Sequence, residues 1–278
     1  MQTDTMSQTH LQAFECFLIE RELSCSTRQQ YLRAVKRFLS DPELPDRVAV
    51  LARKNELLKS YAVTSANAIL AAWNLFFRFL KRNDLRVRQF KVQKQLFCPA
   101  EEELSKDEYE RLVRTAQRKN NQRLALLLET ICATGIRVSE LTAITVEAAR
   151  TGVATVSCKG KTRCIVIVSK LRKKLLSYAR LHHIEGGIIF RTQSGKAIDR
   201  SNIWREMKAL CKEAQVSPKK VFPHNLRHLF ARLFYAVDKD LSGLADVLGH
   251  SNINTTRIYI ISSGREHRRR MEQLHLIL

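Results

Sequence analysis

The run from Phe222 to Ile261 constrains the fold more than any other stretch, because its spacing predicts three successive short helices. Pro223 suits the first position of a helix, and the large apolar residues after it recur at steps of three and four. These apolar residues are Leu226, Leu229, Phe230, Leu233 and Phe234. A second helix is expected over about 241–248, ended by Gly249 in left-handed backbone, and a third begins near Asn254.

Four side chains able to act on a phosphate fall at the ends of these helices. His224 and Arg227 share the first turn of the first helix, and His250 directly follows the second. Tyr259 lies on the second turn of the third. Each residue alone has an ordinary explanation as a surface cation, a capping residue or a half-buried aromatic. Together they form a set of four groups able to act on a phosphate that could converge at one place.

A metal site is the main alternative for this run. His224 and His228 are four residues apart, as in zinc-protease helices. However, Asn225 stands where such a helix carries its general-base Glu, and no third ligand is evident in the sequence. The sequence therefore predicts no bound metal and no cofactor.

The same run resembles the C-terminal signature of the tyrosine recombinase (phage integrase) family, which is His-x-x-Arg, then Leu-Gly-His, then a nucleophilic Tyr. Here the signature falls on His224 to Arg227, on Leu248 to His250, and on Tyr259. Two positions depart from it. Asp238 stands where the family usually ends the first helix with Gly, and Ile260-Ile261 replace a frequent Thr-His pair. Asp tolerates left-handed backbone, so we expect the turn to form at Asp238.

The segment Ala133 to Leu141, ATGIRVSEL, resembles the other hallmark of that family. An apolar helix is predicted over about 122–134, and Gly135 follows it. The resemblance makes Arg137 the first catalytic arginine, at the start of the next helix. We expect Glu140 to orient Arg137 or nearby backbone rather than to react.

A basic hairpin is predicted next, with strands over about 152–157 and 164–168. The connection between them, residues 158–163, holds three basic residues. In the family the catalytic lysine stands just ahead of a Gly in this hairpin, which corresponds to Lys159 here. Lys161 takes that role if the turn differs.

Other elements of this part of the chain are expected to be scaffold. The capping box Ser105-x-x-Glu108 begins a helix to about residue 117, and helices are expected over 170–183 and 201–216. Ile188 to Phe190 form a short strand in this interpretation. The buried side of the 201–216 helix is expected to hold Ile203, Trp204, Met207, Leu210 and Cys211. Residues 264–278 form an amphipathic basic tail whose apolar end needs a docking site.

Four helices are predicted in the first part of the chain, over about 9–23, 27–39, 46–60 and 65–82. Thr9 and Ser26 are placed to cap the first two. This unit resembles the core-binding (SAM-like) domain of the same family. A basic linker is expected from about residue 84. The expected fold is mainly α with a small β-sheet: a core-binding domain over 1–98 and an α+β catalytic domain over 99–278.

The charge indicates a polyanionic partner, because 48 Lys and Arg against 27 Asp and Glu give a net charge of +21. Residues 1–98 carry 16 basic and 9 acidic residues, hence +7, and the remainder carries 32 and 18, hence +14. The seven cysteines include no Cys-x-x-Cys pair, which favours reduced thiols over disulfides or a zinc ribbon. No apolar run approaches the ~18 residues of a membrane span. We therefore expect a cytoplasmic, DNA-associated protein that does not contact membranes.

The resemblance implies a site-specific recombinase that joins Tyr259 to a DNA 3′-phosphate and then reverses the reaction. Its implied partners are double-stranded recombination sites and three further copies of the chain, arranged as a tetramer that exchanges C-terminal tails. An accessory DNA-bending or directionality factor is left open. Two other functions compete: a DNA-binding protein without catalysis, and a topoisomerase-like enzyme that uses the same tyrosine without site preference.

Overall fold

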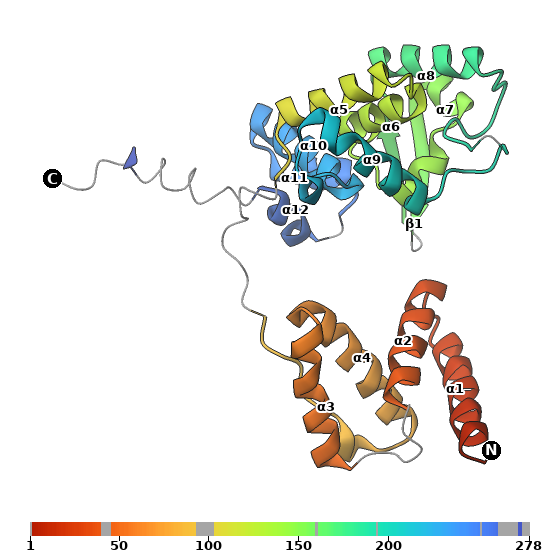
Figure 1. Cartoon of the computed structure of the whole chain (residues 1–278), viewed down its shortest axis with the longest axis vertical. Helices are drawn as coiled ribbons and strands as arrows, with labels where there is room; N and C mark the ends of the chain where they lie inside the picture. Colours follow the sequence, from red (N-terminus) through yellow and green to blue (C-terminus); the bar gives the residue numbers. More distant parts are fainter. Residues whose placement is uncertain are drawn as a thin grey trace. The chain divides into compact units, whose positions relative to one another are not determined.

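The chain forms two compact units, Met1–Lys94 and Gln95–Leu278, in the computed structural model shown in Figure 1. The structure describes residues 2–39, 46–92, 103–158, 161–192, 194–250, 252–260 and 272–273, without the side chains of 2–8, 158, 161 and 257–260. The described part is mostly helical with one two-stranded sheet, which confirms the predicted fold class. None of its helices is long and apolar enough to cross a membrane.

The first unit is built from α1 (Gln2–Glu20), α2 (Cys25–Phe38), α3 (Arg47–Ser60) and α4 (Val63–Phe79). Its core is aromatic, with Phe14, Phe38 and Phe76 almost fully buried. The predicted caps were wrong. Thr9 lies inside α1, and Ser24 rather than Ser26 accepts the hydrogen bond that begins α2. Ser24 has the extended backbone required at a helix N-cap, whereas Ser26 is already helical.

Residues 84–92, which were expected to lie in the linker, pack against the first unit instead. Leu85, the last residue of the 3₁₀ turn η1 (Asn83–Leu85), and Val87 are buried in the core of that unit. The Asn74 side chain accepts from the Val87 backbone N–H and donates to its carbonyl, both at 2.8 Å. Two asparagine amides thus hold an extended segment that has no helical period, since Asn67 binds Phe90 in the same way.

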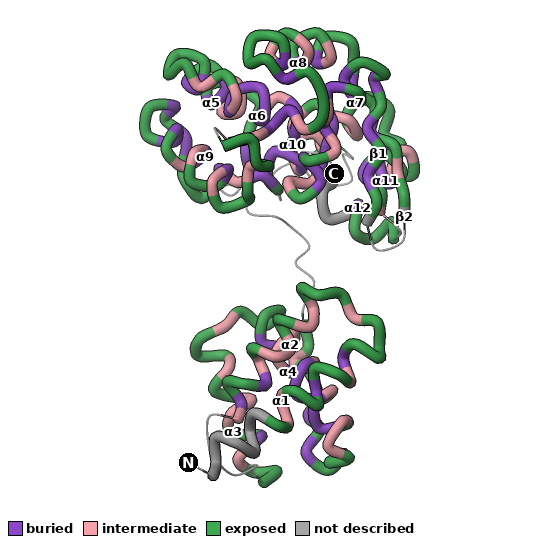
Figure 2. Tube along the Cα trace, turned by 90° about the vertical axis from the view of Figure 1, so that its right-hand side faces the viewer, coloured by how far each residue is buried: buried purple, intermediate pink, exposed green. Residues whose placement is uncertain are grey.

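The second unit is organised around α6 (Gln122–Thr134), which packs against four other helices. These are α5 (Lys106–Arg118), α8 (Ser169–Leu181), α9 (Arg200–Ala214) and α10 (Pro223–Asp238). Figure 2 shows α6 as a largely buried segment of this unit, and the buried residues of α10 all lie in its first part, before residue 232. Ser105 and Glu108 form the predicted capping box at the start of α5. The central position of α6 fixes its C-terminal end, from which the candidate site is built.

A hairpin of β1 (Val153–Cys158) and β2 (Lys161–Val166) follows the short helix α7 (Val146–Thr151). The strands are antiparallel and pair from Val153 with Val166 to Cys158 with Lys161, so the connection is shorter than the sequence suggested. The predicted strand at 188–190 was wrong, because Ile188 forms only an isolated bridge with Thr145. Trp204 is 51% exposed, so the apolar side of α9 is narrower than expected.

The last helices, α10, α11 (Leu241–Leu248) and α12 (Ile253–Ile260), match the three expected from the sequence. The 3₁₀ turn η4 (Pro218–Lys220) precedes them. Gly249 ends α11 in left-handed backbone as predicted. The turn after α10 differs: Asp238 is its last helical residue and Lys239 adopts the left-handed conformation, with a φ of 62°. Leu233 is 43% exposed, which removes it from the predicted core face.

Candidate active site

Arg227 is the buried centre of the polar cluster at the C-terminal end of α6. Only 1% of the residue is exposed. Its guanidinium donates through Nη1 to the carbonyl of Gly135 and through Nη2 to the carbonyl of Leu248, the latter at 2.8 Å. The two carbonyls lie at the C-terminal ends of two helices, α6 and α11, where backbone acceptors have no partner within the helix. Arg227 therefore joins the end of α6 to the end of α11.

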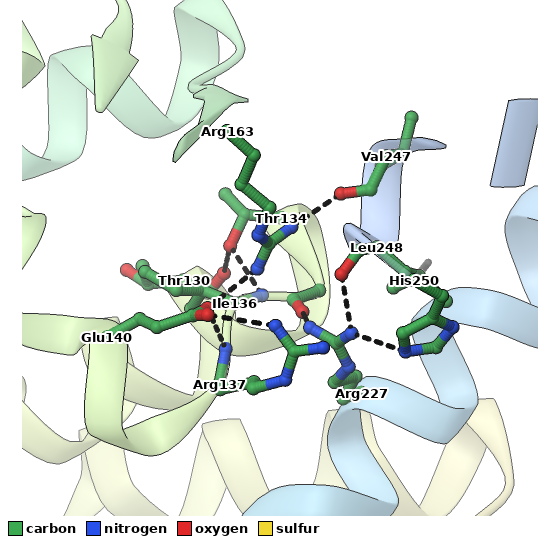
Figure 3. Close-up of polar contacts among 11 residues, drawn as sticks. Thr130, Thr134, Ile136, Arg137, Glu140, Arg163, Arg227, Val247, Leu248 and His250 are labelled. Carbon is green, nitrogen blue, oxygen red and sulfur yellow. Dashed lines mark hydrogen bonds and ion pairs between the residues drawn. The ribbon is translucent and has the colours of Figure 1, made fainter. Parts of the chain in front are cut away.

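His250 lies beside this guanidinium, and Figure 3 shows the contact. Its Nε2 is 3.0 Å from Nη2 of Arg227, and its Nδ1 is 2.9 Å from the hydroxyl of Thr256 on α12. Because arginine can only donate, Nε2 must accept, so the neutral ring carries its proton on Nδ1 and donates it to Thr256. Burial, reinforced by three nearby guanidiniums, lowers the pKa of His250 to about 4. The imidazole is therefore neutral at pH 7.

Arg137 stands at the N-cap of the 3₁₀ helix η3 (Val138–Ala143), two residues after the left-handed Gly135. Its backbone N–H and its Nη1 both donate to the carboxylate of Glu140, at 3.0 and 2.9 Å. The Arg137 side chain is 35% exposed, whereas that of Glu140 is 7% exposed. A buried carboxylate thus holds both the backbone N–H and the guanidinium of Arg137, while part of the side chain reaches solvent.

Glu140 also binds a second arginine, which the sequence did not single out. Arg163 of β2 donates through Nη2 to Glu140 Oε2 at 2.6 Å and through Nη1 to the carbonyl of Val247 at 2.6 Å. Burial disfavours the charged carboxylate, but hydrogen bonds from Arg137 and Arg163 outweigh it and hold the pKa of Glu140 below its ordinary value. The only sequence signal for Arg163 was the basic composition of the hairpin connection.

Two glycines let these segments approach closely. At Gly135 a Cβ would lie 2.5 Å from the ring of Phe230 on α10, and the backbone has a φ of 62°. At Gly249 a Cβ would lie 2.2 Å from Cδ of Arg163, with a φ of 65°. Real Cβ atoms do not come this near to other heavy atoms, and left-handed backbone costs other residues about 1–2 kcal/mol. Both glycines therefore serve packing as well as chain direction.

His224 lies on the first turn of α10, one helical turn from His228, and their rings meet edge to face with centroids 4.7 Å apart. Partial removal from water, together with the nearby Arg227 and Arg137, lowers the pKa of His224. Burial and the neighbouring His224 lower the pKa of His228 to about 4. Among the residues that the structure describes, no three His, Cys, Asp or Glu side chains gather as a metal site would require.

The remaining predicted site residues are described only in part. Tyr259 belongs to α12, the helix that also carries Thr256, but its side chain is outside the described atoms. Lys159 lies outside the described residues. The backbone of Lys161 begins β2, opposite Cys158. The structure thus brings together Arg137, Arg227 and His250, and sets the helix of Tyr259 against them through Thr256.

A wide hollow lies elsewhere on the second unit. It has a volume of about 1270 Å³ and is lined by Arg123, Tyr178 and Glu206, among others. None of the predicted site residues lines it. The arginine cluster is instead built on the ends of helices and on a hairpin, an arrangement that suits an extended phosphate polymer better than an enclosed small molecule.

Comparison with known proteins identifies the class to which this fold and cluster belong. The family model described as "Phage integrase family" matches residues 102–265. Tyrosine recombinase XerA of Pyrococcus furiosus is 27% identical over 290 residues, covering 100% of this chain and 98% of the relative. Tyrosine recombinase XerD of Halalkalibacterium halodurans is 30% identical over 271 residues, covering 87% and 88%.

Solved structures agree with the sequence relatives. The crystal structure of XerA recombinase matches 98% of this chain and 100% of that chain, with 26% identity and a TM-score of 0.55. A lambda integrase dimer bound to a COC′ core site matches 91% and 76%, with a TM-score of 0.72 and 20% identity, which shows the shared fold. The chain belongs to the phage integrase family. It is a site-specific recombinase of the tyrosine type, an enzyme that cleaves and rejoins DNA.

Proposed function

We propose that this enzyme cleaves DNA by attack of the Tyr259 hydroxyl on a backbone phosphorus, with Arg137 and Arg227 binding the phosphate. The bond from phosphorus to the 5′-oxygen breaks, and the product is a 3′-phosphotyrosyl link. Because the link conserves the energy of the broken bond, a 5′-hydroxyl from a second strand can reverse the reaction without ATP. The convergence of Arg137, Arg227 and His250 at the end of α6 carries the proposal.

The two arginines supply the charge that the transition state needs. Attack on a phosphodiester concentrates negative charge on two non-bridging oxygens, and planar guanidiniums match that geometry while remaining charged at every working pH. Arg227 is fixed by two backbone carbonyls and Arg137 by Glu140. Their orientation is therefore set before DNA binds, which is the condition for strong electrostatic stabilisation. The proposed chemistry needs no metal ion.

Proton transfers complete the cycle. His224 accepts the phenolic proton of Tyr259, and burial together with nearby guanidiniums lowers its pKa, which favours the neutral imidazole that this role requires. A lysine of the hairpin, Lys159 or alternatively Lys161, gives a proton to the departing 5′-oxygen. His250 donates to a phosphate oxygen once the negative charge of DNA places a proton on Nε2, which accepts from Arg227 in the free protein.

The proposed partners are two double-stranded recombination sites and four copies of this chain. XerH has been solved bound to its difH substrate, and lambda integrase as a tetramer bound to a Holliday junction. The net charge of +21 supports a DNA substrate here. We further propose that the unit 1–94 also binds DNA, and that tails from 264–278, of which only residues 272–273 are among the described residues, link neighbouring copies.

The test uses nicked duplexes tiled across the genomic neighbourhood of the gene, incubated with protein in EDTA and resolved in SDS. Wild type and Tyr235→Phe, which alters a tyrosine of α10, are expected to form a covalent adduct on one duplex, and Tyr259→Phe none. An adduct that persists in Tyr259→Phe would show that another residue is the nucleophile. Relaxation of a plasmid without any site would favour a topoisomerase, and tight binding without an adduct would favour a non-catalytic DNA-binding protein.

A further inference from the structure

Arg163 links three segments of the site that are far apart in the chain. It belongs to β2, and one of its two terminal nitrogens binds Glu140, which also holds Arg137. The other binds the carbonyl of Val247, directly before the Leu248 carbonyl that Arg227 holds. Figure 3 shows this guanidinium between the α6 end and the turn after α11.

Burial and close packing support the contacts of Arg163. The Arg163 side chain is 13% exposed and that of Glu140 is 7% exposed, so the ion pair between them forms largely away from water. Alternation along β2 places Arg163 on the same face as the buried Ile165. Gly249 leaves the space that the methylenes of Arg163 occupy, because a Cβ there would lie 2.2 Å from Cδ.

We propose that Arg163 is a positioning residue that fixes the hairpin against the arginine cluster, so that the hairpin lysine meets the leaving 5′-oxygen. This inference rests on the proposed function. In this proposal Arg163 acts through the hairpin and not by contact with DNA, and its two terminal nitrogens hold Glu140 and the Val247 carbonyl. A misplacement of about 1 Å can cost roughly 10² in rate, so loss of either bond should slow protonation of the leaving group.

The test compares two DNA substrates that differ in one atom. In the first, an ordinary phosphodiester, the leaving 5′-oxygen must receive a proton as the bond to phosphorus breaks. In the second, sulfur replaces that bridging oxygen, and a thiol with a pKa of about 8.5 leaves as its anion without an acid. A defect in delivering the lysine proton therefore affects the first substrate and spares the second.

Arg163→Lys is the main variant, because a lysine keeps the charge but cannot hold two acceptors with a planar fork. Adduct formation on the oxygen substrate is expected to fall about 10- to 100-fold, and on the sulfur substrate less than about threefold. The ratio of the two rates is measured within one preparation, so a partly folded variant remains interpretable. Arg163→Gln, which can still donate to one acceptor, is expected to show the same change in ratio.

Arg123→Lys is the matched control. Arg123 also donates to one carbonyl, that of Arg191, and to one carboxylate, that of Glu206, and its side chain is 24% exposed. It lies outside the proposed site, so its substitution should leave the ratio at the wild-type value. An equal loss on both substrates in Arg163→Lys, or no loss on either, overturns the role of Arg163. No adduct from wild type on either substrate overturns the proposed function instead.

Discussion

At the scale of single residues, Arg227 is at once a structural and a proposed catalytic group. Its guanidinium satisfies two helix-end carbonyls while lying beside His250. Removing the whole side chain would leave those buried acceptors without donors, at a cost of about 1–3 kcal/mol each. A substitution that separates the two roles must therefore preserve the charge and most of the volume.

Arg227→Lys makes that separation. We expect its free energy of unfolding, from urea denaturation, to fall by an amount similar to that of Arg123→Lys. Adduct formation should fall about 10²- to 10³-fold further than in that control, because a lysine lacks the fork that matches two phosphate oxygens. Equal rates of adduct formation in Arg227→Lys and Arg123→Lys would show that Arg227 has a structural role only.

His228 and His250 give the protein a defined pH dependence of stability. Both have a pKa of about 4 when folded, against about 6.5 in an unfolded chain. Between these values the unfolded state binds more protons, so the free energy of unfolding decreases as the pH falls from about 6.5 toward 4. Allowing for partial exposure, each histidine should contribute a loss of about 1 kcal/mol between pH 7 and pH 5.

The measurement is urea unfolding of the wild type at the two pH values. His228→Gln should lose part of the pH dependence. His182→Gln, which alters an exposed histidine after α8, should retain all of it. A wild-type stability that rises on acidification would contradict the assignment.

The sequence pointed to a residue of the site only where that residue belongs to one of the recognised motifs. The motifs singled out Arg137, Arg227 and His250, and these three side chains lie at the end of α6. Arg163 and Thr256 were missed, because a cation in a hairpin and a threonine in a helix have ordinary solvated explanations. The role of Arg163 depends on a contact with Val247, 84 positions away, which no local pattern reports, and that of Thr256 depends on how the turn after α11 places it beside His250.

At the scale of elements, the turn between α11 and α12 is where the hairpin and the helical site meet. Gly249→Ala combines two penalties there, left-handed backbone and a clash with Arg163. Gly195→Ala provides the control, because Gly195 has a φ of 79° but nothing lies within 4 Å of an added Cβ. The difference between the two variants isolates the contact with Arg163.

We expect Gly195→Ala to cost about 1–2 kcal/mol of unfolding free energy, the price of left-handed backbone alone. Gly249→Ala should cost more, and it should also slow cleavage because Arg163 must move. Differential scanning calorimetry and the adduct assay measure the two effects. Equal effects of the two substitutions would mean that the Arg163 side chain moves away from the added Cβ without loss of stability or cleavage rate.

Long periodic helices were the most predictable elements, and their ends were the least predictable. α6 and α11 were expected with their observed bounds, since Gly135 and Gly249 mark their ends. The end of α10 was wrong by one residue, because Asp238 stays helical and Lys239 takes the left-handed turn. The strand at 188–190 failed because a short apolar run does not reveal whether a partner strand exists.

At the scale of the whole molecule, the charge should govern DNA affinity. Positive charge occurs in both parts of the chain, +7 in residues 1–98 and +14 in the remainder. If both bind phosphates, affinity should fall about 10³-fold or more between 50 and 200 mM salt, through release of counterions. The measurement is fluorescence anisotropy with Tyr259→Phe, which prevents covalent capture. A shallow salt dependence would indicate that few phosphates are bound.

The order of the site residues along the chain has a consequence for synthesis. The basic first unit is complete by residue 94, whereas the contacts of Arg227 reach back 92 residues to Gly135, and those of His250 reach forward to Thr256. Domains generally fold from the N-terminus as the ribosome makes them, and distant contacts form late. If the first unit binds DNA as proposed, a growing chain can hold DNA before it can cut it, so premature release from the ribosome yields a competitor for DNA rather than an unregulated nuclease.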